Sequence, residues 1–238
     1  MERLQKVMSE RGFCSRRKAE KLIVDGKVRV NGEVVTTLGV KVGKKDSIVV
    51  DGVALDNDIN YEYYLLYKPR GVVTTTSDDK GRKTVVSLID TNTRIYPVGR
   101  LDYDTTGLLI LTNDGELANK LMHPSNEIEK VYIAKVEGVL SGYEIKKLRT
   151  GVMIDGYKTK KARVKLLKTN RDKDTCLVEI TIHEGHNRQI RKMIESLGKK
   201  VIKLKRERYA FLNLDGLKVG KYRKLSNKEV SVLYSLVK

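Results

Sequence analysis

The chain opens with short stretches of helical and alternating apolar spacing. Apolar residues recur with helical spacing over residues 4–8 and again between Ser15 and Gly26, which predicts two short helices. Ser15 stands where the N-cap of the second helix belongs, and Gly26 stands where its C-cap belongs. After them, Asn31-Gly32 separates two alternating runs, which is a strong signal for a β-hairpin.

In the remainder of the chain, strand-like patterns outnumber helical ones and do not alternate regularly with them. Ser141 and Ser226 are each followed three residues later by a glutamate, a capping-box pattern that begins a helix. This arrangement favours an α+β fold with a mixed, largely antiparallel sheet over a doubly wound fold. The expected strands cover residues 63–67, 108–111, 131–136, 176–182 and 201–204, and the expected helices cover residues 116–122, residues 188–197 and the segments after Ser141 and Ser226.

The patterns also suggest where one domain ends and the next begins. A chain of 238 residues is long enough for one or two domains. Residues 1–60 have the pattern of a small separate module, and the polar, acidic segment 53–60 (VALDNDIN) is the expected linker. We therefore expect an N-terminal module at 1–60 and one larger α+β domain at 61–238.

The charge composition narrows the class of partner. The chain has 48 lysine and arginine residues against 30 aspartate and glutamate residues, a formal net charge of +18. A surplus of this size points to a polyanion, usually nucleic acid, although a merely solvated surface is the alternative. Residues 151–238 hold 23 basic and 9 acidic residues and residues 1–45 are also basic, so two basic zones flank a nearly neutral middle.

Other classes of protein are excluded by what the chain contains. Cys14 and Cys176 do not suit a disulfide scaffold or a zinc site, so we expect both to be small buried or half-buried residues. The sequence has no run of 18 apolar residues, and its charged N-terminus (MERLQKVMSERG) does not resemble a signal peptide. We expect a cytoplasmic protein without a membrane partner, and a monomer because no long apolar stripe is left over.

The most unusual stretch is residues 99–107 (GRLDYDTTG), which lies just before an expected strand. Loops of this kind concentrate binding and catalytic groups. Asp102 and Asp104 are two residues apart, so on an extended backbone both face the same way. The pair could work as acid and base, could hold a divalent cation, or one aspartate could act alone while Arg100 and the threonines shape the loop. A polar turn whose aspartates bond their own backbone fits the same residues.

Long motifs of the chain resemble a known enzyme family. Residues 99–115 (GRLDYDTTGLLILTNDG) are similar to the catalytic motif of a group of ribosomal RNA pseudouridine synthases, formed by synthase A of the small subunit with synthases B, E and F of the large one. The segments YLLYKPRGVVTTTSDDKGRKTVVSLI, GELANKLMHPSNEIEKVYIAKVEG and HEGHNRQIRKMIESLG are similar to the same family, and DDKGRKTVV and LMHPSNEIEK look most like its synthase B branch. Residues 1–60, with a basic cluster and DGKVRVNG, resemble the small α-L RNA-binding domain.

The resemblance implies roles for particular residues. Asp102 matches the essential aspartate of the family. Arg100 matches the arginine that enters the RNA helix and helps to hold the target nucleotide flipped out. Tyr132 matches the tyrosine that packs on the flipped uracil and is a candidate to take the proton from carbon five. Arg191 matches the basic residue that pairs with the catalytic aspartate, and its neighbour Arg188 is an alternative for that role.

The remaining candidates are one loop residue and a set of RNA contacts. Asp104 is not the family's catalytic residue, so we expect it to shape the loop. Lys203 and Lys205 alternate with apolar residues, so one strand face is cationic and could follow a phosphate backbone, with a solvated face as the alternative. The predicted RNA-binding residues are Arg16, Arg17, Lys18, Lys27, Arg29, Lys68, Arg100, Arg188, Lys203 and Lys205.

The reaction that the resemblance implies breaks a carbon–nitrogen glycosidic bond and forms a carbon–carbon bond with no net redox change. We therefore expect no ATP, nicotinamide or metal cofactor. Large-subunit ribosomal RNA is the favoured substrate, either free or in an assembly intermediate, and the sequence leaves open whether Asp102 adds to the sugar, adds to the base or abstracts a sugar proton. The competing classes are a non-catalytic RNA-binding or ribosome-assembly factor and, more weakly, an RNA glycosidase that releases free base.

Overall fold

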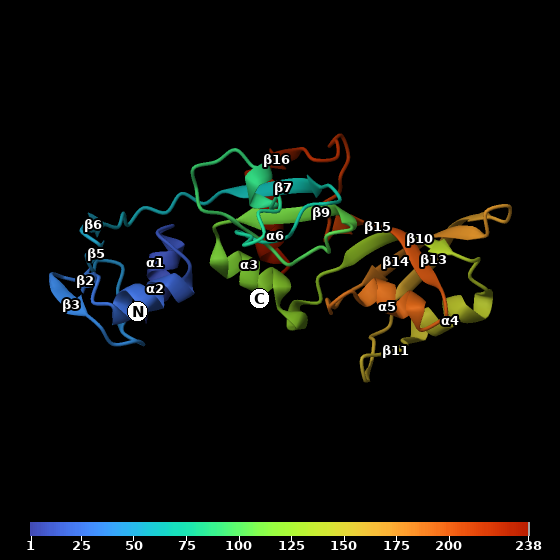
Figure 1. Ribbon diagram of the computed structural model, residues 1–238, viewed down its shortest axis with the longest axis horizontal. Coiled ribbons are helices and arrows are strands. Elements are labelled where there is room, and N and C mark those ends of the chain that lie inside the picture. The colour runs from blue at the N-terminus through green and yellow to red at the C-terminus, as the bar shows by residue number, and fades with distance from the viewer. Residues whose placement is uncertain (238) are drawn as a thin grey trace. The chain divides into compact units, whose positions relative to one another are not determined.

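The computed structural model describes residues 1–237, which form two compact units. One unit holds residues 1–62 with the short segments 91–95 and 113–115, and the other holds the remainder. Figure 1 shows the order of the elements along the chain. None of the helices in the described part of the chain has the length and apolar character needed to cross a bilayer.

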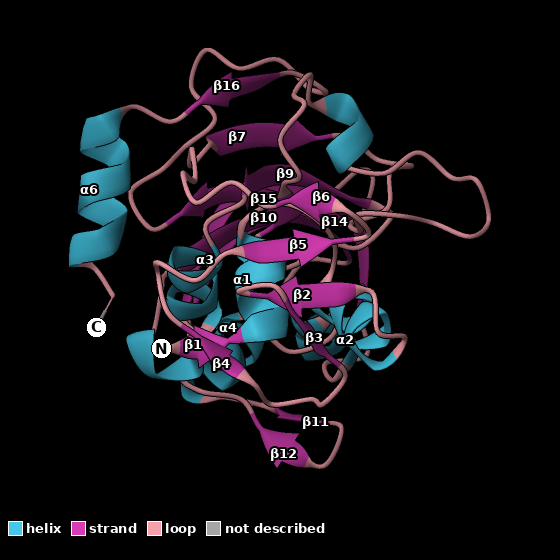
Figure 2. Ribbon diagram, turned by 90° about the vertical axis from the view of Figure 1, so that its left-hand side faces the viewer, coloured by secondary structure: helices cyan, strands magenta, loops and turns pink. Residues whose placement is uncertain are grey.

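In the smaller unit, two helices pack with short strands (Figure 2). Ser15 caps the second helix as predicted, because its Oγ accepts a hydrogen bond from the Lys18 backbone N–H at 3.2 Å. Asn31 and Gly32 both have positive φ, as a tight hairpin turn requires. The elements are α1 (Leu4–Glu10), α2 (Arg16–Val24), β1 (Glu2–Arg3) paired with β4 (Lys41–Val42), and a sheet in the order β3 (Glu33–Val35), β2 (Val28–Val30), β5 (Ile48–Val50), β6 (Val53–Ala54).

The predicted linker is wrong at its start. Val53 and Ala54 form β6, which pairs antiparallel with β5. Asp51 and Gly52 both adopt positive φ, so the chain turns back on itself at once instead of leaving the unit. The acidic composition of segment 53–60 concealed this two-residue strand.

The larger unit is built on one eight-stranded sheet. Neighbouring strands are antiparallel except for β9 and β15, which are parallel, so the predicted α+β fold with a largely antiparallel sheet is confirmed. Its order is β13 (Arg163–Asn170), β14 (Thr175–Ile182), β10 (Lys130–Glu137), β15 (Lys200–Tyr209), β9 (Thr105–Thr112), β7 (Tyr63–Lys68), β16 (Tyr222–Lys224), with β8 (Tyr96–Pro97) also on β9. The other elements are α3 (Gly115–Met122), α4 (Gly142–Thr150), α5 (Gln189–Glu195), α6 (Asn227–Ser235), the hairpin β11 (Met153–Ile154) and β12 (Tyr157–Lys158), and 3-10 turns at Val86–Leu88 and Pro124–Asn126.

Both predicted capping boxes are present. Ser141 begins α4 and Ser226 begins α6, and in each case the glutamate three residues later bonds back to the serine backbone N–H. Strand β13 has no counterpart among the predicted elements. A bulge between Leu166 and Lys168 interrupts its pairing with β14, so the alternation of apolar residues that marks a strand is broken in the sequence.

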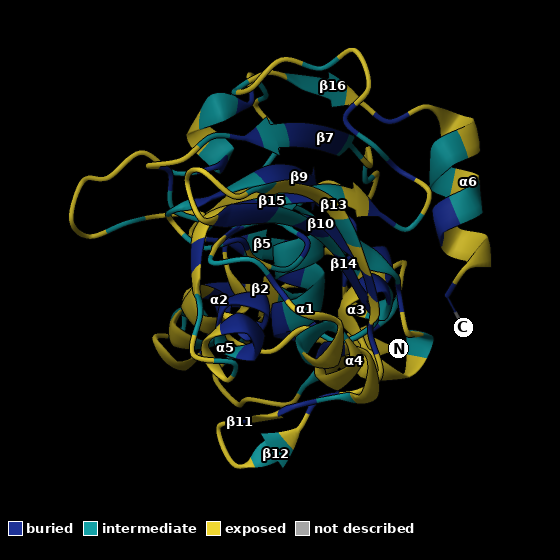
Figure 3. Cartoon of the chain, turned by 90° about the vertical axis from the view of Figure 1, so that its right-hand side faces the viewer, coloured by how far each residue is buried: buried dark blue, intermediate teal, exposed yellow. Residues whose placement is uncertain are grey.

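The core of the larger unit lies between the sheet and two helices. Buried positions concentrate in β7, β9 and β14 and in α5 (Figure 3). Leu65 and Ile110 of the sheet share one cluster with Leu121 of α3 and Leu233 of α6. Cys176 is buried and free, as predicted, and so is Cys14 in the smaller unit.

Gly107 sits where β9 and β15 come closest together. Its φ is 124°, and a Cβ atom placed there would lie 2.3 Å from the Arg206 carbonyl oxygen and 2.5 Å from the Arg206 nitrogen. Real Cβ atoms essentially never approach backbone atoms that closely. Glycine at this position is therefore what allows the parallel pair to form.

We expect Gly107→Ala to lower the free energy of unfolding by at least about 3 kcal/mol, because both strand backbones must separate to admit the methyl group. Gly216→Ala is the matched control, since Gly216 also has positive φ but has nothing within 4 Å of the position that its methyl group would occupy. That control should lose only about 1 kcal/mol. Urea unfolding curves of the two variants measure the difference, and equal losses would contradict the steric explanation.

Lys68 ties the end of β7 to the turn that precedes β9. Its side chain is fully buried, and its Nζ donates to the carbonyl oxygens of Pro69 at 3.0 Å, Asp102 at 3.0 Å and Thr105 at 2.9 Å. All three ammonium protons are thereby used. The prediction that Lys68 binds RNA is wrong, because the group that would contact a phosphate is inside the protein.

Burial lowers the pKa of Lys68 to about 8, while the nearby Asp102 and Asp104 carboxylates oppose that change. Between pH 8 and about 10.5 the unfolded chain therefore keeps a proton that the folded chain has released, so stability from this group rises with pH. We expect the free energy of unfolding of the native chain to gain up to about 3 kcal/mol relative to Lys68→Met across that range. Urea titrations at several pH values test this, and a pH-independent difference would contradict it.

Candidate active site

The turn before β9 presents two carboxylates to solvent while its backbone is held from behind. The Thr105 N–H donates to the Asp102 carbonyl at 3.0 Å, and the Gly71 N–H donates to the Tyr103 carbonyl at 2.9 Å. These bonds use only main-chain oxygens, so the carboxylates stay free for other partners. The Asp102 side chain is 29% exposed and that of Asp104 is 38% exposed.

Helix α5 directs two guanidinium groups at this turn. Arg188 is the N-cap of α5 and has a φ of 51°, a left-handed conformation that is uncommon for a residue other than glycine and that recurs at functional sites. Arg191 lies one turn further along and is buried, and its Nη1 donates to the Val201 carbonyl at 3.2 Å. One arginine is therefore in contact with solvent and the other is fixed in the interior.

Two carboxylates and two arginines form one charge cluster. Arg188 Nη1 lies 3.6 Å from Asp102 Oδ2 and 3.9 Å from Asp104 Oδ1. Arg191 Nη2 lies 2.8 Å from Asp104 Oδ2, whereas its Nε lies 3.9 Å from Asp102 Oδ2. The predicted contact between Arg191 and Asp102 is present but long, and Arg188 lies slightly closer to Asp102.

Asp104 does more than shape the loop, contrary to expectation. It is the closest counter-ion of Arg191, at 2.8 Å, and Asp102 has no contact as short with either arginine. Arg191 Nε is buried and has no hydrogen-bond partner within residues 1–237. Asp104 therefore holds the buried guanidinium, and Asp102 is left with a carboxylate that is partly exposed and loosely paired.

Tyr132 belongs to a row of residues that crosses four strands. It pairs with Arg206 of β15, Arg206 pairs with Gly107 of β9, and Gly107 pairs with Lys68 of β7. Paired residues in adjacent strands point to the same face of a sheet. The side chains of Tyr132, Arg206 and Lys68 therefore share one face, and Lys68 bonds the Asp102 backbone from that face.

Arg206 is a buried cation that is not among the predicted site residues. It is 2% exposed, its Nε donates to the Leu108 carbonyl at 2.8 Å, and its guanidinium lies 5.2 Å from the Tyr209 ring centroid. Burial also lowers the pKa of the neighbouring Lys130 to about 8 and raises that of Tyr209 to about 12. The interior around Tyr132 is therefore poorly hydrated and cationic. The sequence could have indicated this burial, because Arg206 follows the buried positions Val201 and Leu204 in the alternation of its strand.

Arg100, Lys203 and Lys205, the other predicted site residues of the larger unit, lie outside the charge cluster. Arg100 is exposed two residues before Asp102 and takes part in no ion pair in the described part of the chain. Lys203 and Lys205 pair with Lys135 and Ile133 of β10, so they point to the face opposite Tyr132. A hollow of about 420 Å³ adjoins the charge cluster and is lined by Asp104, Glu137, Arg188, Arg191, Glu195, Lys200, Val201 and Ile202.

The smaller unit carries the remaining basic candidates. Arg16, Arg17 and Lys18 are exposed in the first turn of α2, which has no acidic residue there. Lys27 lies 3.7 Å from the Asp51 carboxylate, and Arg29 donates to the Gly32 carbonyl at 3.0 Å. The first three are cations that have no carboxylate partner among residues 1–237. The structure groups no three or more His, Cys, Asp or Glu side chains suitably for a metal ion within that same range.

The chain is similar in sequence and in fold to known RNA pseudouridine synthases. The chain is 55% identical over 237 residues to the ribosomal large subunit pseudouridine synthase B of Bacillus subtilis, covering 99% of this chain and 97% of that protein. It is 43% identical to an uncharacterized RNA pseudouridine synthase of Aquifex aeolicus, covering 99% and 94%. A crystal structure of a pseudouridylate synthase matches with a TM-score of 0.71 at 30% identity, covering 98% of this chain and all of that one.

Two family models match separate parts of the chain. The S4 domain model matches residues 2–48, and the RNA pseudouridylate synthase model matches residues 62–196, which include Asp102, Asp104, Tyr132 and both arginines. The chain is thus a member of the RNA pseudouridylate synthase family, an isomerase with an S4 domain at its N-terminus.

Proposed function

We propose that this protein isomerises a uridine of ribosomal RNA to pseudouridine, that large-subunit ribosomal RNA is the substrate, and that it does so in the cytoplasm. The name of the Bacillus subtilis relative supports the choice of RNA. The net charge of +18 supports a polyanionic substrate. A chain that only bound RNA would not need the arrangement of carboxylates and arginines around the turn before β9.

The observation that carries this proposal is the state of Asp102. Its carboxylate is partly exposed, its two arginine contacts are 3.6 and 3.9 Å long, and its backbone is fixed by Lys68. A nucleophile must be held in position and still be free to leave its resting partners. Asp104 supplies the permanent partner of Arg191, so Asp102 meets both conditions.

In this mechanism Asp102 acts on a nucleoside that has left the RNA stack. Extrusion of the base costs a few kcal/mol, and an aromatic ring and an arginine can offset that cost. Tyr132 would pack on the uracil, and the exposed Arg100 would occupy the vacated space in the helix. Asp102 attacks or stabilises the electron-poor sugar carbon while the bond from C1′ to N1 breaks. C1′ then bonds to C5, the C5 proton is lost and N1 gains a proton, so mass and redox state are unchanged.

The exposed cations divide between docking and catalysis. We assign Arg16, Arg17 and Lys18 of α2, with Lys27 and Arg29 nearby in the sequence, to RNA docking by the S4 domain. Arg188 is exposed and touches both carboxylates, so it is suited to transfer one contact to an RNA phosphate when substrate arrives. Arg191 stays with Asp104 in the interior.

We expect Asp102→Asn to abolish tritium release from a large-subunit ribosomal RNA transcript labelled at uracil C5, because the amide cannot replace the carboxylate. Asp104→Asn is the matched control at the same turn. It removes the counter-ion of Arg191 but keeps the reacting group, so we expect up to about a 100-fold lower single-turnover rate. RNA affinity and the melting temperature should stay near native in Asp102→Asn.

Turnover by Asp102→Asn would overturn the assignment of this residue. Release of free uracil by the native chain would instead indicate a glycosidase. If the native chain forms no pseudouridine and Asp102→Asn changes only the RNA affinity, the protein is a non-catalytic RNA-binding factor.

A further inference from the structure

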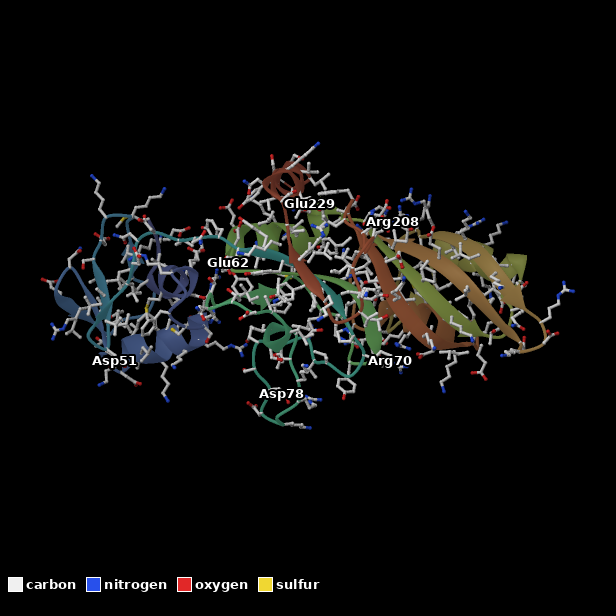
Figure 4. The ribbon with its side chains drawn as sticks, turned by 90° about the horizontal axis from the view of Figure 1, so that it is seen from above. Asp51, Glu62, Arg70, Asp78, Arg208 and Glu229 are labelled. Carbon is white, nitrogen blue, oxygen red and sulfur yellow. The ribbon has the colours of Figure 1, made fainter. Side chains whose placement is uncertain are left out.

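The sheet of the larger unit has a second face, opposite Tyr132, that carries Lys203 and Lys205 and none of the groups assigned to catalysis. On β10 and β14, most residues that share a face with Tyr132 are buried, among them Ala134, Val178 and Ile180. Helices α4 and α5 pack against that side (Figure 1). The opposite face of β13, β14, β10 and β15 is laid open in the view from above, where Arg208 is labelled (Figure 4).

Basic side chains dominate this surface, which we call the open face. Strand register places Lys203 beside Lys135, and Arg208 beside Val131 on β10. On β14, Glu179 and Leu177 stand beside Lys165 and Lys168 of β13. The open face is defined by the residues Lys135, Arg163, Lys165, Lys168, Lys203, Lys205 and Arg208.

Most of these cations are not neutralised by the protein. Arg163 pairs with Glu129, and Lys205 pairs with Glu207. The other five form no ion pair with any residue that the structure describes, and four of them are exposed. A hollow of about 420 Å³ opens on the same face and is lined by Arg163, Lys165 and Arg208 and also by Glu129 and Glu179. Lys203 and Lys135 are directly opposite each other on adjacent strands, and like charges so placed repel one another unless an anion lies over them.

The strands that form the open face supply no group on which a base could stack, and a ring beside its cations, that of half-buried Tyr67 on β7, lies with its centroid 6.0 Å from Lys205 Nζ. The side chains that β13, β14, β10 and β15 contribute to it are basic, acidic, aliphatic or hydroxyl-bearing, and none is aromatic. Proteins that bind single-stranded RNA stack its bases on aromatic rings. Double-helical RNA is instead recognised through its phosphates and 2′-hydroxyls. The chemistry of this surface therefore fits the backbone of an RNA duplex.

We propose that the open face is a second RNA-binding surface, which takes the phosphate backbone of a double-helical segment of the substrate RNA away from the target uridine. This inference rests on the proposed function, because it assumes a large, folded RNA substrate. Tyr132 and the open face lie on opposite sides of one sheet, so the duplex held here is not the segment that enters the active site. The surface contributes affinity and leaves the chemical step unchanged.

The test uses two triple variants of the full-length chain. The first, Lys165→Gln with Lys168→Gln and Lys203→Gln, removes three exposed cations of the open face that lack ion pairs within the described residues. The matched control, Lys146→Gln with Lys218→Gln and Lys228→Gln, removes three exposed lysines from α4, the segment after β15 and α6. Both variants lose the same net charge, so a long-range electrostatic effect acts on them equally.

Binding to a large-subunit ribosomal RNA transcript is measured over a range of salt concentrations, with turnover at saturating RNA. We expect the open-face variant to bind about tenfold more weakly than the control. The slope of its log affinity against log salt concentration should be shallower than that of the control by about two to three. Its kcat should equal that of the control. Equal affinities for the two variants would overturn the proposal, and so would a loss of kcat without a loss of affinity.

The same data separate this inference from the proposed function. If the native chain forms no pseudouridine but the open-face variant still binds more weakly than the control, the open face binds RNA and the assigned reaction is wrong. If pseudouridine forms and the two variants bind alike, the reaction stands and the open face is only solvated. Melting temperatures within a few degrees of native for both variants establish that each has folded.

Discussion

The parallel contact between β9 and β15 is the constraint on which the catalytic arrangement depends. Two parallel strands begin at the same edge of a sheet, so what precedes each of them is brought together. The turn with Asp102 and Asp104 precedes β9, and α5 with Arg188 and Arg191 precedes β15. Gly107 permits this contact, since any side chain there would collide with the Arg206 backbone. One glycine thus decides whether segments some 85 residues apart in the sequence form a site.

Buried charge gives this arrangement its rigidity and also its reactivity. Lys68 uses all its protons on carbonyl oxygens behind the turn, and Arg191 divides its guanidinium between Asp104 and the Val201 carbonyl. A buried charge is costly unless such partners are complete. Arg191 Nε remains without a hydrogen-bond partner among the described residues and faces Asp102 at 3.9 Å. The buried cations beside Asp102 have close polar partners, whereas the Asp102 carboxylate, where the chemistry is proposed to occur, has only long contacts with arginines.

Local signals in the sequence predicted local structure well. The caps at Ser15, Ser141 and Ser226 and the turn at Asn31-Gly32 depend on neighbouring residues only, and all four are present. The motif around Asp102 also led to the correct cluster, because its residues are close in sequence and α5 has its own motif. What the sequence could not give was the pairing of Arg191 with Asp104 and the contact of Arg188 with both carboxylates, because these depend on distances between separate segments.

The sequence also could not show which individual cations are buried. Composition counts Lys68 and Arg206 with the surface charges, yet both are interior groups, because strand register and not residue type decides which face a side chain occupies. The same register places Lys203 and Lys205 away from Tyr132. The charge surplus therefore separates into interior cations that hold the site, cations at the site, and an open face on the other side of the sheet.

The most direct measurement is a map of pseudouridines in large-subunit ribosomal RNA from cells that lack this protein and are complemented with either the native chain or Asp102→Asn. We expect at least one pseudouridine to disappear in the deficient cells, to return with the native chain and to stay absent with Asp102→Asn. An unchanged map in the deficient cells, or full restoration by Asp102→Asn, would contradict the central role given to this carboxylate.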